Sequence, residues 1–74
     1  MNFDFMYFSK MLEVMRRPES RGYMTFTEAK FHCGLPDKYK RSTYISVYHN
    51  DIVALFPKGA NETVYFLRHG YDTN

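Results

Sequence analysis

DKYKRSTYISVYHN, residues 37–50, is the stretch that decides the fold, because it fits two secondary structures. As a helix it places Tyr44, Val47 and Tyr48 on one face, at spacings of three and four. As a strand, its β-branched residues alternate with serine and tyrosine between 42 and 48, which is a local preference for strand. The length of the segment, its proline-aspartate start and its flanking elements favour a helix. We therefore predict a helix and retain the strand as the alternative.

Upstream of this stretch, a helix is predicted from Met1 to Arg17. Its apolar residues recur at spacings of three and four, as on one helical face: Phe5, Phe8, Leu12 and Met15. Arg16 and Arg17 suit the negative end of the helix dipole. Pro18 cannot continue the ladder of backbone hydrogen bonds, so we expect the helix to end before it.

A second helix is predicted from Phe26 to Cys33. Thr25 and Glu28 stand at the spacing of a capping box, in which each side chain bonds the backbone N–H of the other. Gly34 follows at the position where a left-handed residue commonly ends a helix. Residues 23–25, just before the cap, have room only for a short bridge of strand.

The C-terminal third predicts a β-hairpin. Two short apolar runs, Ile52–Phe56 and Val64–Leu67, flank a loop that contains proline, glycine and asparagine. Such runs, separated by turn-forming residues, are typical of two antiparallel strands and their connection.

The order of these elements resembles the winged helix-turn-helix superfamily. The residues that carry the resemblance are Thr25-Phe26-Thr27-Glu28-Ala29 in the second helix, Cys33-Gly34-Leu35 in the turn, Lys40-Arg41-Ser42-Thr43 and Ser46 in the third helix, and Ile52–Phe56, Lys58-Gly59 and Val64–Leu67 in the wing. The resemblance implies an α+β fold, a small winged helix-turn-helix domain with three helices and a C-terminal β-hairpin wing. The domain would cover residues 1–69, and a polar tail would follow at 70–74. If residues 41–48 form a strand instead, the fold becomes two helices on a three-stranded sheet.

What the resemblance implies about function is a DNA-binding transcriptional regulator that docks its third helix in the major groove of double-stranded DNA. The charge pattern agrees, because residues 30–49 hold four basic residues against Asp37 alone. The residues expected at the DNA are Lys30, Lys38, Tyr39, Lys40, Arg41, Ser42, Thr43, Ser46 and Lys58. The net charge of the whole chain is only +2, which favours a homodimer that doubles the phosphate contacts.

The abundance of aromatic residues supports a function of another class. Phe and Tyr make up 19% of the chain, more than one small core has room to bury. Four of them crowd the N-terminus and are the candidate partner-binding residues: Phe3, Phe5, Tyr7 and Phe8. Small aromatic-rich chains of this kind resemble accessory proteins of phages and mobile elements, which bind a host protein. That alternative predicts an exposed aromatic patch that includes Phe3, Phe5, Tyr7 or Tyr65.

Composition excludes several other classes. With 74 residues the chain has room for one domain, and its single cysteine forms no intrachain disulfide, so we expect a cytoplasmic protein. No apolar run is long enough to span a bilayer, so no membrane partner is expected. Adjacent His32 and Cys33 point to different sides of a helix, and no histidine or cysteine cluster has metal-binding spacing. We predict no enzymatic activity, no catalytic residue, no metal and no cofactor.

Overall fold

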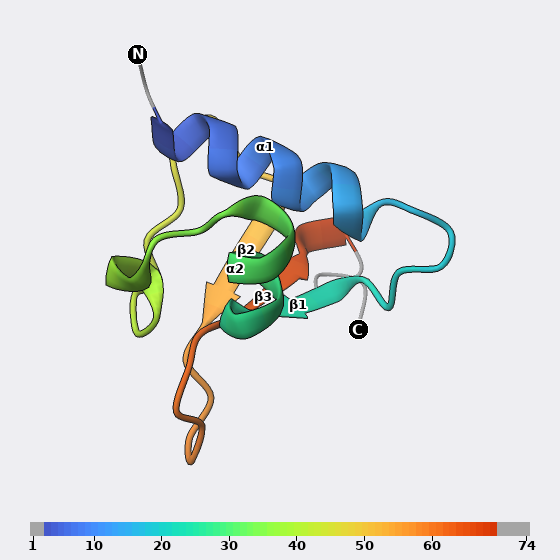
Figure 1. Cartoon of the computed structure of the whole chain (residues 1–74). Helices are drawn as coiled ribbons and strands as arrows, with labels where there is room; N and C mark the ends of the chain where they lie inside the picture. Colours follow the sequence, from blue (N-terminus) through green and yellow to red (C-terminus); the bar gives the residue numbers. More distant parts are fainter. Residues whose placement is uncertain (1–2, 70–74) are drawn as a thin grey trace.

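Two helices and a three-stranded antiparallel sheet form the fold (Figure 1). The computed structural model describes residues 3–69. Its elements, in chain order, are α1 (Phe3–Met15), β1 (Tyr23–Thr25), α2 (Phe26–Cys33), a 3₁₀ turn (Asp37–Tyr39), β2 (Ile52–Leu55) and β3 (Val64–Leu67). The strand order is β1-β3-β2, so the last strand in the sequence lies in the centre of the sheet.

The predicted winged helix-turn-helix fold is wrong, because the third helix does not form. Only Asp37–Tyr39 make a short 3₁₀ helix, and residues 41–50 form turns but neither a helix nor a strand. The alternative, a strand at 41–48, is therefore wrong as well, although the fold that it implied, two helices on a three-stranded sheet, does form, with β1 as the third strand. A helix would use the Lys40 and Ser42 carbonyls for its own turns. Both carbonyls instead accept hydrogen bonds from Thr63, one from its backbone N–H at 2.8 Å and one from its hydroxyl at 3.0 Å.

Two serine side chains within the segment also compete with helix formation, because they bond nearby backbone N–H groups. The Ser42 Oγ accepts a hydrogen bond from the Tyr44 N–H at 3.1 Å, and the Ser46 Oγ accepts one from the Tyr48 N–H at 3.4 Å. Serine side chains that bond nearby backbone groups offer the chain an alternative to a helix. The segment therefore follows an irregular path, which we call the irregular segment, residues 41–50.

The elements with strong local signals form as predicted. Glu28 and Thr25 make the capping box at the start of α2, and Gly34 ends the helix with φ of +70°, a conformation that glycine adopts without strain. The hairpin pairs β2 with β3 antiparallel, from Ile52 opposite Leu67 to Leu55 opposite Val64. The short strand β1 pairs with the other edge of β3, so it is more than an isolated bridge.

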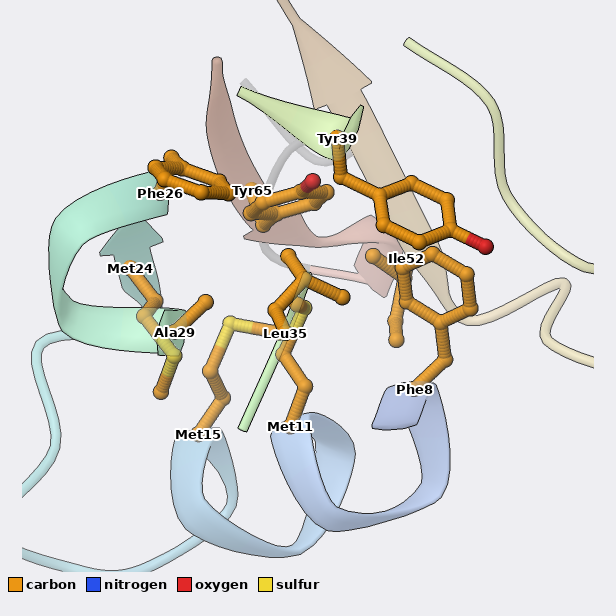
Figure 2. Close-up of a cluster of buried hydrophobic side chains, with 10 residues drawn as sticks. All are labelled: Phe8, Met11, Met15, Met24, Phe26, Ala29, Leu35, Tyr39, Ile52 and Tyr65. Atoms are coloured by element: carbon orange, nitrogen blue, oxygen red, sulfur yellow. The ribbon is translucent and has the colours of Figure 1, made fainter. Parts of the chain in front are cut away.

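One hydrophobic core holds these elements together, on the face of the sheet that the helices cover (Figure 2). Its buried side chains are Phe8, Met11, Met15, Met24, Phe26, Ala29, Leu35, Tyr39, Ile52 and Tyr65. Phe8, Met11 and Met15 follow each other at spacings of three and four, so they lie on one face of α1. This apolar face is the one that the helix buries against the core. Tyr65, from the central strand, is fully buried.

Within residues 3–69, no helix is long and apolar enough to cross a membrane. The polar tail predicted for residues 70–74 lies outside the described residues.

Candidate functional site, an apolar surface with a basic margin

A cluster of exposed apolar side chains joins the N-terminal half of α1 to the irregular segment. Its members are Phe5, Tyr44, Val47 and Tyr48, whose residues are 44%, 48%, 77% and 68% exposed. We call this cluster the apolar surface. The ring contact between Phe5 and Tyr48 brings together residues about forty positions apart in the sequence, which only the tertiary fold does.

Ring contacts hold the apolar surface in place. The ring centroids of Phe5 and Tyr48 are 5.7 Å apart with their planes nearly perpendicular, and Tyr44 stacks on the buried Tyr39 at 6.3 Å. Tyr39 is fixed in turn, because its hydroxyl donates a hydrogen bond to the Asp4 carboxylate on α1. These rings are therefore held in defined orientations.

His49 anchors the irregular segment beneath this surface. Its imidazole is buried, packs against Phe5 with centroids 4.8 Å apart, and shares a hydrogen bond of 2.9 Å between its Nε2 and the Ser9 Oγ. The buried Nδ1 has no hydrogen-bond partner among residues 3–69. Burial lowers the pKa of His49, and the negative charge of Asp51 opposes that effect.

We expect acid to weaken the fold through this residue. Because the pKa of His49 is lower in the folded chain than in the unfolded chain, the unfolded chain binds the proton more readily. The stability that neutral His49 contributes is complete above about pH 7 and declines as the pH falls through about 6.5. Urea unfolding at about pH 7.5 and about pH 5.5 should show this decline, and His49→Gln should reduce it. An equal decline in the Gln variant would assign the effect to other groups.

The four candidate partner-binding residues of α1 have different environments. Phe3 and Phe5 are exposed, Tyr7 is half-buried with its ring against Tyr39, and Phe8 is fully buried in the core. Tyr65 is buried as well. The N-terminal aromatics therefore do not form one surface, and Phe5 is the one that contacts the exposed ring of Tyr48.

The residues predicted to contact DNA do not lie together on a helix. Tyr39 and Ser46 are buried, and the Ser42 hydroxyl bonds the backbone, so these three groups hold the chain in place. The remaining candidates, Lys30, Lys38, Lys40, Arg41, Thr43 and Lys58, are exposed.

Ion pairing divides the basic residues into two groups. Lys10, Arg16, Arg17, Arg21 and Lys30 each pair with a carboxylate. The bond to Lys30 lowers the pKa of its partner, Asp37. Lys38, Lys40, Arg41 and Lys58 have no ion pair to a carboxylate of residues 3–69.

Three of these unpaired cations, Lys38, Lys40 and Arg41, precede Tyr44 by three to six positions in the chain, and we call them the basic margin. The Lys38 Nζ lies 5.2 Å from the ring centroid of Tyr39, the residue on which Tyr44 stacks. Arg41 lies over the Phe56 ring at 5.7 Å. A cation over the face of an aromatic ring makes a favourable electrostatic contact, so the positions of Lys38 and Arg41 are in part fixed.

The Cys33 thiol and the possible metal ligands of residues 3–69 decide whether this part of the chain could hold a nucleophilic or a metal site. Burial raises the pKa of the Cys33 thiol to about 11, so its thiolate form is scarce near neutral pH. No group of three or more His, Cys, Asp or Glu residues between 3 and 69 could hold a metal ion.

Sequence reasoning did not include Tyr44, Val47 and Tyr48 among the candidate site residues. Their helical spacing placed them on one face, and such a face normally packs against a core. Because the third helix does not form, the helical spacing does not predict burial, and the three side chains are exposed.

A comparison of the chain with family models, curated proteins and solved structures finds no match.

Proposed function

We propose that this protein is a binding module that docks a partner protein on its apolar surface. The partner presents a complementary apolar patch flanked by carboxylates that face the basic margin. The single observation that carries this proposal is the cluster of Phe5, Tyr44, Val47 and Tyr48, exposed and in part fixed by ring contacts. Aromatic side chains with few freely rotating bonds lose little entropy on binding, and they are enriched at the centres of interfaces.

Charge supports the same kind of partner. The basic margin of Lys38, Lys40 and Arg41 has no ion pair with a carboxylate among residues 3–69, whereas Lys10 of α1 and Lys30 of α2 are each paired. Unpaired rim charges steer the encounter with an oppositely charged partner and add specificity. An acidic rim around an apolar patch is therefore the complement of this surface.

The double variant Val47→Ser/Tyr48→Ser tests the proposal. Both side chains are largely exposed, so folding should be preserved, while loss of an aromatic anchor commonly costs about 2 kcal/mol or more of binding energy, roughly thirtyfold in affinity. The chain is immobilised, its partner is captured from cell lysate and identified by mass spectrometry, and its affinity is then measured by calorimetry.

The matched control is Phe31→Ser. Phe31 is 84% exposed but lies on α2, where its ring contacts only His32 among the rings described for residues 3–69. The partner should bind this variant as it binds the original chain. A partner that binds all three chains equally would rule out the apolar surface as its docking site.

A second candidate function is binding of nucleic-acid phosphates, favoured by the four unpaired cations Lys38, Lys40, Arg41 and Lys58. The carbonyls of Lys40 and Ser42 accept hydrogen bonds from Thr63, at the base of the hairpin loop that carries Lys58. These bonds hold the basic margin at the end of the sheet from which that loop extends. With no helix in residues 41–50 to enter a groove, these contacts would read the backbone rather than the sequence.

Under this second candidate, Lys40→Ala/Arg41→Ala should weaken binding to a random labelled duplex and reduce the salt slope by about 2, since each phosphate contact contributes about one unit. The assay is fluorescence anisotropy at about 50 and about 200 mM salt. Lys10→Ala/Arg17→Ala removes the same charge from cations that pair with Glu13, and it should change binding less. Equal effects of the two double variants would assign binding to net charge alone.

A further inference from the structure

The direction of the backbone groups of β2 follows from hydrogen bonds made by β3. The Leu67 N–H donates to the Gly22 carbonyl at 3.0 Å, on the β1 side, and the Arg68 N–H donates to the Asp51 carbonyl at 2.7 Å, on the β2 side. In an antiparallel ladder, successive residues direct their N–H and C=O groups to opposite sides. Residues 64 and 66 of β3 therefore bond β2.

Register then identifies which β2 residues make those bonds. Val53 is opposite residue 66 and Leu55 is opposite residue 64, so these two bond β3. Ile52 and Ala54 direct their N–H and C=O groups away from β3, toward the open edge of the sheet. The Ile52 N–H confirms this direction, because it donates to the His49 carbonyl, although at 3.4 Å. Ala54 makes no such bond with any residue between 3 and 69.

A groove of about 370 Å³ runs along this edge, within the size range of ligand sites. One wall is the edge itself, at Ile52 and Ala54, and the other is the irregular segment, with Thr43, Ser46 and Val47. In Figure 1 this segment, drawn in yellow, lies on the side of β2 away from β3.

We propose that this groove binds a short extended segment of a partner protein, which adds to the edge of β2 as a further strand. Ala54 offers one donor and one acceptor side by side, which is the complement of an extended backbone. An added strand needs about 4.8 Å beside the edge, whereas a second copy of this chain would bring its whole sheet against the irregular segment. We therefore take a single extended segment as the occupant of the groove.

This inference rests on the proposed function and names the form of the partner. Val47 belongs both to the apolar surface and to the wall of the groove, so the two sites are continuous. A partner whose extended segment lies in the groove would place adjoining apolar residues on Tyr48 and Phe5. Backbone bonds at the edge supply affinity, and the side chains beside them supply specificity.

Ala54→Pro is the test variant, because proline removes the outward N–H and leaves the bonds from Val53 and Leu55 to β3 in place. Ala54→Ser is its matched control, since it keeps the N–H and a small side chain. The probe is a phage-displayed library of short random linear peptides, selected on the original chain. We expect synthetic versions of the enriched peptides to bind Ala54→Pro at least about tenfold more weakly, and Ala54→Ser within about twofold.

A second measurement needs no variant and so remains valid if Ala54→Pro fails to fold. In the free chain, the Ala54 amide should exchange with deuterium much faster than the Val53 and Leu55 amides, and saturating peptide should protect it. Methylation of single peptide nitrogens should weaken binding at every second position, as expected for a paired strand.

Three results would overturn the inference. The first is a library that enriches nothing above a control chain, and the second is peptides that bind without protecting the Ala54 amide. The third is self-association that Ala54→Pro abolishes, which would make a second copy the occupant. A captured partner could also bind Val47→Ser/Tyr48→Ser more weakly than the original chain but bind Ala54→Pro equally well. That result would overturn strand addition while the proposed function stands.

Discussion

Phe8→Ala is expected to cost about 3–5 kcal/mol of the free energy of unfolding, the usual price of truncating a fully buried phenylalanine. The Phe8 ring lies against Tyr39, Tyr44, His49 and Tyr65, with centroids 5.7 to 6.4 Å apart, so its loss opens a cavity where α1, the irregular segment and β3 meet. A domain of this length has roughly 4–11 kcal/mol of stability in total. The variant should therefore lose a large fraction of the free energy of unfolding and unfold at a much lower urea concentration than the original chain.

Urea unfolding followed by circular dichroism measures this effect. Phe8→Leu fills part of the same space and should keep the chain folded at reduced stability, which gives a measurable value if the alanine variant does not fold. Phe31→Ala, at the largely exposed site on α2, should change the free energy of unfolding by no more than about 0.5 kcal/mol. Similar losses at Phe8 and Phe31 would contradict the placement of Phe8 in the core.

Thr63→Val is expected to cost about 1–3 kcal/mol, although valine has nearly the same shape. Thr63 is fully buried, and its hydroxyl donates to the Ser42 carbonyl at 3.0 Å. Valine leaves that carbonyl without its partner in the interior, which is the main cost. The backbone bond from residue 63 to the Lys40 carbonyl is preserved, so the irregular segment should loosen at residues 42–44 rather than detach.

Amide hydrogen exchange and urea unfolding together test this second prediction. Exchange should accelerate in the irregular segment and remain slow in α1 and α2. Thr43→Val is the matched control, because the same change at an exposed threonine removes no buried bond. If Thr63→Val and Thr43→Val unfold at the same urea concentration, the Thr63 hydroxyl does not hold the segment.

Part of the candidate site follows from local sequence signals, and part depends on the tertiary structure. The aromatic crowding at the N-terminus and the basic stretch from Lys38 to Arg41 are both visible in the sequence. The sequence does not separate Phe8, which is buried, from Phe5, which is exposed, because both fit one helical face until neighbouring elements cover part of it. Nor does it indicate which cations find a carboxylate, since Arg16 pairs with Asp51, 35 positions away.

The sequence by itself determined the elements whose signals lie within a few residues. Thr25, Glu28 and Gly34 set both ends of α2, and two apolar runs around a turn-rich loop set the hairpin, because caps and turns satisfy their backbone groups locally. The irregular segment was decided only by the tertiary structure. Its residues fit both a helix and a strand, with the helix preferred, but Thr63, more than twenty positions from Lys40 and Ser42, binds the carbonyls that a helix would need.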